Sequence, residues 1–187
     1  MTRLKSIRAH GGMGLTEFDA RAEKLKLRSP EPPENLERKI LEKKYSRDEI
    51  QYYYFIRVVH QWTRMLRPRM PFEQYIEAYL QADKRKSGWR RYDFSLRHMK
   101  RVHEKLFGTA FNEKNTKHSE KASDPYGSLS VVCRVVRDSG PYRDEYIVRK
   151  IIAYARKGYS IFVHYGGSHA VVQRPLLKEL LNGNNDV

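Results

Sequence analysis

The residues Leu129 to Val136 read LSVVCRVV, a nearly continuous apolar run dominated by valine. Valine favours β-strands, and a short apolar run without alternation is typical of a strand buried on both faces of a sheet. A helical pattern in residues 143–157 separates this run from a second apolar run, residues 160–165. A glycine pair and another helical pattern follow. This order predicts a βαβα unit over residues 128–182, with parallel strands joined by a right-handed crossover.

Helical spacing dominates the part of the chain that precedes this unit. Ser46 and Glu49 have the spacing of a capping box, which predicts the start of a long helix over residues 50–66. Apolar residues then recur at i, i+3, i+4, i+7 and i+8 after Pro71, as on one face of an amphipathic helix. We therefore expect a helical layer over residues 36–108.

The predicted fold class is α/β, with a helix-rich N-terminal and central part and a C-terminal βαβα unit that belongs to a parallel or mixed sheet. Residues 1–29 show no sustained period, and we expect a short strand or loop there, followed by a short helix. A length of 187 residues suits a single domain, 1–187. Two parallel strands cannot cover their own faces and edges. The other strands would come from residues 4–9, from a second copy in a homo-oligomer, or from a missing N-terminal half of a larger fold.

Positive charge is in excess and unevenly distributed. The chain has 37 Lys and Arg against 22 Asp and Glu, a formal charge of +15, which favours nucleic acid, phosphate-bearing ligands or an anionic membrane surface as partner. Nine Lys and Arg lie in residues 84–105 against two acidic residues, with three aromatic residues between them. A nucleic-acid-binding protein could use this segment to contact phosphates and stack on bases. The candidate residues are Arg85, Lys86, Trp89, Arg90, Arg91, Arg97, Lys100 and Arg101.

The distribution of apolar residues and the single cysteine exclude several classes of protein. No stretch approaches the roughly 18 consecutive apolar residues of a membrane span, and the first residues lack the apolar region of a secretory signal. A single cysteine, Cys133, excludes an internal disulfide and a thiolate zinc cage, and its apolar surroundings predict a place in the core. We expect a cytoplasmic protein without a membrane span.

The turn after the second apolar run carries the candidate chemistry. Ligands of open parallel sheets bind at the carboxyl ends of strands, and neutral imidazole is a common ligand of first-row metals. His164 ends the predicted strand, and His169 begins the next element, so both are candidate metal ligands. Gly166, Gly167 and Ser168 lie between them and are candidate ligand-binding residues. In the structural alternative, the glycines only form the turn and His169 packs locally.

Two nucleophile or phosphate motifs are excluded at this turn. The sequence GGSHA at residues 166–170 nearly matches the G-x-S-x-G nucleophile elbow, but no histidine follows His169, as the α/β-hydrolase order requires. A P-loop is excluded because neither the glycines of residues 11–14 nor those of residues 166–167 are followed by a Lys-Ser or Lys-Thr pair.

Two segments of the C-terminal part resemble a known family. Residues 142–147, YRDEYI, and residues 161–170, IFVHYGGSHA, are similar to the C-terminal part of the TraB/ChaN/Tiki superfamily, which includes erythromycin-esterase-like and haem-uptake members. The family pattern pairs Arg-Asp or Arg-Asn at a helix start with a later G-x-x-H after a strand. In this chain the first pair would be Arg143 and Asp144, and the later motif would end at His169.

The resemblance implies a TraB/ChaN-like, metal-dependent hydrolase of a small-molecule or peptide substrate, or a ligand-binding domain. His169 would bind a divalent metal or act as general base, His164 would be a second ligand, and Arg143 would stabilise developing negative charge. Asp144 would contribute to the ligand site, with capping of a helix as its structural alternative. No second family motif precedes residue 30, which implies an incomplete or inactive site.

Overall fold

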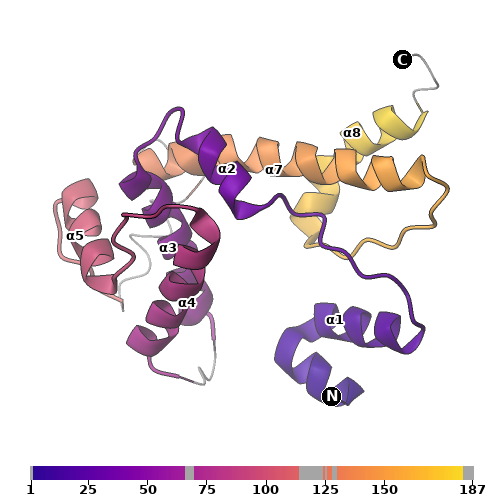
Figure 1. Ribbon diagram of the computed structural model, residues 1–187, viewed down its shortest axis with the longest axis horizontal. Coiled ribbons are helices and arrows are strands. Elements are labelled where there is room, and N and C mark those ends of the chain that lie inside the picture. Colours follow the sequence, from indigo (N-terminus) through magenta and orange to yellow (C-terminus); the bar gives the residue numbers. More distant parts are fainter. Residues whose placement is uncertain (1, 66–69, 114–123, 125, 128–129, 183–187) are drawn as a thin grey trace. The chain divides into compact units, whose positions relative to one another are not determined.

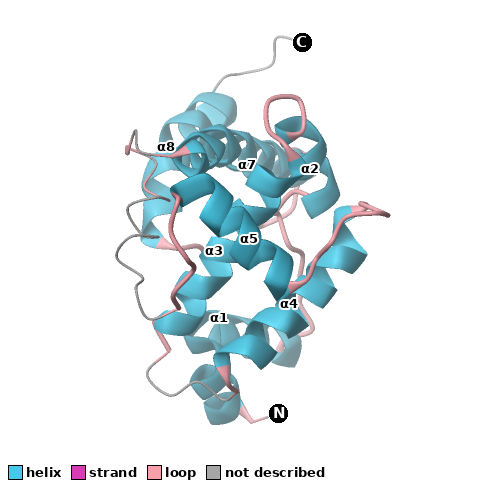
Figure 2. Cartoon of the chain, turned by 90° about the vertical axis from the view of Figure 1, so that its left-hand side faces the viewer, coloured by secondary structure: helices cyan, strands magenta, loops and turns pink. Residues whose placement is uncertain are grey.

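The computed structural model describes residues 2–65, 70–113, 124, 126–127 and 130–182 (Figure 1). Within these residues the chain forms helices and no strand, as Figure 2 shows by its colours. The helices are α1 (Arg3–Ala22), α2 (Glu34–Leu41), α3 (Arg47–Thr63), α4 (Phe72–Ser87), α5 (Leu96–Phe107), α7 (Val131–Ala155) and α8 (Gly167–Asn182). The predicted α/β fold class is therefore wrong. None of these helices is long and apolar enough to cross a bilayer.

Local signals correctly predicted the helices of the central layer. α3 begins at Arg47 because Ser46 Oγ accepts a hydrogen bond from the Glu49 backbone at 3.3 Å, while the Glu49 carboxylate accepts one from the Ser46 backbone at 2.7 Å. This is the predicted capping box. α4 begins directly after Pro71, as predicted. α3 ends at Thr63, with Arg64 as its C-cap, three residues before the predicted end of the long helix at residue 66.

The chain divides into two compact units, and the division falls within α7. The central unit is Pro32–Arg143, and the terminal unit consists of Met1–Glu31 and Asp144–Val187. In the central unit, α3 packs against α4 and α5, and α2 packs against α4. Aromatic and aliphatic side chains of α3 form the centre of its core; the most completely buried are Ile50, Tyr52, Phe55, Ile56 and Val59.

The predicted first strand is helical from residue 131 onward. Residues 131–136 form the first turns of α7, and Leu129 lies outside the described residues. Val132 and Val135 are fully buried and pack into the core of the central unit, whereas Arg134 is exposed. The same valines therefore fit a helix that is buried on one face. Packing of that face outweighs the slightly lower helix propensity of valine.

Residues 138–141, DSGP, have the composition of a turn but are also helical. α7 continues through Pro141, although a proline inside a helix removes one backbone hydrogen bond. Polar contacts hold the helix just before this proline. Asp138 accepts hydrogen bonds from Lys44 Nζ at 3.0 Å and from Tyr45 Oη at 2.9 Å. These contacts are within the central unit, and they fix α7 at the position where its sequence favours a turn.

The second predicted strand, residues 160–165, adopts no regular secondary structure and joins α7 to α8. The predicted βαβα unit over residues 128–182 is therefore absent from its described part, which contains two helices and this connection. Residues 4–9 do not supply a strand either, since they belong to α1. That helix is interrupted at Gly11, whose φ of 60° and ψ of −141° are not helical and suit glycine.

Candidate functional site

Two residues that the sequence analysis identified as candidates, Asp144 and His169, are in contact. His169 Nδ1 lies 3.0 Å from Asp144 Oδ1, and the same carboxylate oxygen accepts a hydrogen bond from Gln173 Nε2 at 2.7 Å. The Asp144 side chain is 17 % exposed and that of His169 is 34 % exposed. When Nδ1 donates to a carboxylate, the neutral imidazole carries its lone pair on Nε2, as in a general base. Asp144 thus orients a partly accessible histidine.

The helix-capping alternative for Asp144 is wrong, because this residue lies in the interior of α7 and not at its start. Its carboxylate instead connects α7 to α8 through His169 and Gln173. Sequence reasoning missed Gln173, whose side chain is buried. The spacing of His169 and Gln173 on one face of α8 is the signal that could have found it.

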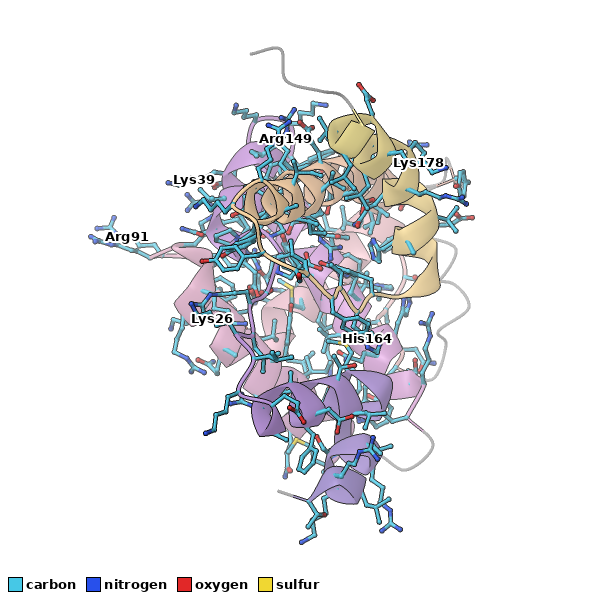
Figure 3. All side chains as sticks on the ribbon, turned by 90° about the vertical axis from the view of Figure 1, so that its right-hand side faces the viewer. Lys26, Lys39, Arg91, Arg149, His164 and Lys178 are labelled. Carbon is cyan, nitrogen blue, oxygen red and sulfur yellow. The ribbon has the colours of Figure 1, made fainter. Side chains whose placement is uncertain are left out.

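The two predicted metal-binding histidines have different partners. His164 Nδ1 lies 2.7 Å from Thr16 Oγ1 of α1, a contact within the terminal unit, whereas His169 contacts Asp144. Figure 3 labels His164. Among the described residues, no group of three or more His, Cys, Asp or Glu side chains could hold a metal ion, which contradicts the expectation of a metal-binding protein built on this turn. A divalent cofactor stays a prediction from the sequence alone.

The other predicted residues of the turn have local roles or none that the structure describes. Gly166 accepts backbone hydrogen bonds from His169 and Ala170 at 3.1 and 3.4 Å, and α8 starts at Gly167. A Cβ at either glycine would meet open space, so no close approach requires them. The Ser168 side chain lies outside the described part. Arg143 is the last residue of the central unit, and its role in charge stabilisation stays a prediction.

The second candidate site is the basic segment 84–105, which comprises the end of α4, a turn and most of α5. Its aromatic side chains are buried or partly buried. Trp89 and Phe94 are 5 % and 3 % exposed, and the Trp89 ring packs against the Arg38 guanidinium, 4.6 Å from the ring centroid. Tyr92 donates a hydrogen bond to Asp48 at 2.9 Å. These aromatic side chains anchor the turn, so the predicted stacking of Trp89 on a base is not what its position favours.

The basic side chains of this segment fall into two groups. Three of them form exposed ion pairs: Lys86 with Glu34 at 3.1 Å, Lys100 with Glu73 at 3.3 Å, and Arg101 with Asp93 at 3.5 Å. The others are exposed and form no ion pair with any described residue; they are Lys84, Arg85, Arg90, Arg91, Arg97 and Lys105. Figure 3 shows Arg91 extending away from the chain into solvent. The second group is available to an external anion.

A surface hollow lies beside three of the cations of the second group. It has a volume of about 610 Å³ and is lined by Gln81, Lys84, Arg85, Gly88, Trp89 and Arg90. Gly88, with φ of 75°, ends α4 in the left-handed conformation and redirects the chain into the turn. The hollow therefore combines three cationic side chains with a turn whose direction is set by one glycine.

Sequence reasoning missed a buried arginine network directly beneath this turn. Arg38 is fully buried and donates hydrogen bonds to Asp83 Oδ1 at 2.6 Å and to Gln51 Oε1 at 2.9 Å. Gln51 in turn donates to the other Asp83 oxygen at 2.6 Å, and the Arg38 guanidinium lies 4.1 Å from the Tyr54 ring centroid. Because Arg38 and Asp83 are 45 residues apart, no local pattern indicates the pair.

Comparison with protein-family models, with curated proteins and with solved structures finds no match. The resemblance to the TraB/ChaN/Tiki superfamily thus depends on the two short sequence segments alone and stays a prediction. Any function has to be argued from the sites themselves.

Proposed function

We propose that this chain binds the phosphate backbone of nucleic acid through the basic surface at the end of α4 and in the turn that follows. The observation that carries this proposal is the position of Lys84, Arg85 and Arg90 around one hollow, exposed and without ion pairs among the described residues. Cations without an ion pair do not have to break a contact with a carboxylate before they bind a phosphate. Their binding energy is therefore available to the ligand.

The support beneath these cations favours binding. Arg90 and Arg91 lie between two anchored aromatic residues, Trp89 and Tyr92. In addition, the Trp89 backbone N–H donates to Ser87 Oγ at 3.2 Å. A turn that is held in place on both sides loses little further conformational freedom on binding. Guanidinium groups can also bind phosphate oxygens with two parallel hydrogen bonds.

Helix electrostatics provide a competing explanation for only some of these charges. Lys84, Arg85 and Lys86 lie in the last turn of α4, where cations stabilise the negative end of the helix dipole. Arg90 and Arg91 lie beyond the helix end, in the turn, and have no such role. These two arginines are therefore the most diagnostic residues for binding.

The burial of the aromatic residues predicts the mode of binding. Recognition of single strands usually depends on bases that stack on exposed aromatic rings, but Trp89 and Phe94 are buried. We therefore expect contacts to phosphates and not to bases. Binding should be independent of sequence, strongly salt-dependent, and at least as tight for duplex as for single-stranded DNA, because the duplex carries the higher charge density.

The test is a fluorescence-anisotropy titration of labelled duplex and single-stranded oligonucleotides between about 50 and 200 mM salt. The double variant Arg90→Gln/Arg91→Gln should bind duplex more weakly, and the slope of log K against log salt should fall by about two, since each lost phosphate contact removes about 0.9. The matched control is Lys39→Gln/Lys43→Gln, which removes two exposed charges elsewhere in the central unit.

Two outcomes would overturn the proposal. One is the absence of duplex binding by the wild-type chain at the lowest salt. The other is an equal loss for both double variants, which would show that net charge alone, and not this surface, attracts the oligonucleotide.

A further inference from the structure

The connection between α7 and α8 exposes an unusual number of apolar side chains. Phe162 is 81 % exposed, and Tyr159, Ile161 and Val163 are between 40 % and 52 % exposed. Exposed apolar residues that are neighbours in the chain, in contrast to single scattered ones, mark interaction surfaces. Two valines near the start of α8 are exposed as well; they are Val171 at 73 % and Val172 at 61 %.

The charged side chains within residues 146–178, which include this connection, have a single sign. Residues 146–178 contain six Lys and Arg and no Asp or Glu. Two of the six contact described neighbours, since Arg149 pairs with Glu145 at 2.8 Å and Lys150 donates to the Ser29 carbonyl. The other four are exposed and form no ion pair with any described residue; they are Arg156, Lys157, Arg174 and Lys178.

We propose that residues 156–178, the lipid-contact segment, attach this chain to the surface of an anionic lipid bilayer. Phe162 and its apolar neighbours would enter the headgroup region, while Arg156 and Lys157 would bind anionic headgroups at its edge. An exposed apolar group flanked by basic residues has the composition of interfacial membrane contacts. A negative lipid surface attracts such flanking cations.

The backbone of the segment limits the depth of this contact. Residues 160–164 form no backbone hydrogen bond with any other described residue. Unpaired amide and carbonyl groups are not tolerated in the hydrocarbon core, but water and headgroups can satisfy them at the interface. We therefore expect shallow insertion in which side chains, and not the backbone, reach the acyl boundary.

Two other occupants fit the observations less well. A second copy of the chain would bring two sets of unpaired cations together, and residues 146–178 contain no acidic residue to offset their repulsion. Nucleic acid would satisfy the cations but would leave Ile161, Phe162 and Val163 in water. An anionic lipid surface satisfies both the charge and the apolar side chains.

The test is co-sedimentation of the full chain with vesicles of phosphatidylcholine alone and with vesicles of phosphatidylcholine and phosphatidylserine in equal parts. We expect the chain to pellet with the phosphatidylserine vesicles only, and to be released by salt. Phe162→Ser should reduce this binding several-fold. Arg156→Gln/Lys157→Gln should reduce it by roughly fivefold per charge. The matched control is Leu36→Ser, a partly exposed leucine of the central unit.

The proposal is overturned if the chain fails to bind phosphatidylserine vesicles, if both vesicle types bind equally, or if Phe162→Ser and Leu36→Ser bind alike. Light scattering after gel filtration measures whether the chain forms a dimer. A dimer that Phe162→Ser abolishes, without any vesicle binding, would assign the surface to a second copy. The nucleic-acid proposal stays separately testable, because Phe162→Ser should leave oligonucleotide binding unchanged and Arg90→Gln/Arg91→Gln should leave vesicle binding unchanged.

Discussion

The core of the central unit and the connection between α7 and α8 use the same residue types in opposite ways. In the central unit, Tyr52, Phe55 and Ile56 of α3 are buried among side chains of α4 and α5. In the connection between α7 and α8, Phe162 is 81 % exposed. Apolar residues on successive amphipathic helices can cover one another, but those of a short connection have no second layer to cover them. The contrast teaches that apolar composition alone does not separate a core from a binding surface.

Arginines show the same contrast within the central unit. Arg38 is buried between the Tyr54 and Trp89 rings and is bound to Asp83, whereas Arg91 extends into solvent. Both belong to the positive excess that favours an anionic partner, yet only the exposed arginine can contact one. Charge counts from sequence therefore overestimate the cations available for binding.

The largest expected effect comes from breaking the buried pair. Arg38→Leu leaves the Asp83 carboxylate buried without its cation, and we expect a loss of about 3–5 kcal/mol in the free energy of unfolding. Urea denaturation monitored by circular dichroism measures this loss. Arg91→Leu is the matched control, with an expected change within about 0.5 kcal/mol. Similar small changes for both variants would refute the contrast between the two arginines.

A smaller loss should follow removal of the hydroxyl that links α7 to the core. The Ser139 hydroxyl contacts Glu37 and lies 2.9 Å from the Tyr53 hydroxyl. Ser139→Ala leaves a buried carboxylate and a buried phenol each short of one partner, so we expect a loss of about 1–3 kcal/mol in urea denaturation. Ser160→Ala, at an exposed serine, should change stability by less than about 0.5 kcal/mol. Equal effects would show that Ser139 is not needed to hold α7 as a helix.

Replacement of Asp144 tests the order of the terminal unit. Asp144→Ala removes the acceptor that orients His169, so the fraction of the neutral imidazole that carries its proton on Nδ1 should fall. Nitrogen NMR of the histidine rings measures this tautomer, and His164, which contacts Thr16, provides the internal control. An unchanged His169 tautomer in the variant would show that Asp144 does not orient the ring.

The smallest expected effect is a pH dependence of the free energy of unfolding that comes from Asp138. Hydrogen bonds from Lys44 and Tyr45 hold the pKa of this carboxyl below its ordinary value. A carboxyl whose pKa is lower in the folded state stabilises the fold at pH values above its ordinary pKa, and the contribution is lost as the pH falls through the folded value. Wild type and Asp138→Asn should therefore differ in urea midpoint at neutral pH and converge in acid. Lys39→Gln should keep a constant difference from wild type over this range.

Local sequence signals predicted the helices of the central layer but not the helical structure of the valine-rich residues 131–136. The Ser46–Glu49 capping box is visible in sequence because both partners lie within one turn. The run at residues 131–136 fits a strand or a helix equally well, since its valines are apolar at both spacings. Contacts of Val132 and Val135 with a distant core decide for the helix.

In the candidate sites, too, the sequence indicated some residues, and only the structure revealed their contacts. Arg90 and Arg91 could be recognised from composition, whereas the burial of Trp89 depends on Arg38, which lies about fifty residues earlier in the chain. Asp144 and His169 were each identified, but their contact joins two helices and has no local signature. The burial of Trp89 and the different partners of His164 and His169 likewise have no local signature in the sequence.

The amino-acid sequence by itself determined the positive charge, the central helices and their caps, because these depend on composition and on neighbours within a few residues. Only the tertiary structure decided that the valine run is helical, that residues 160–165 form no strand, and which cations and apolar side chains face outward. These features depend on partners far away in the chain. Burial of an apolar face or of a charge gains or loses free energy only when its distant partner is in place.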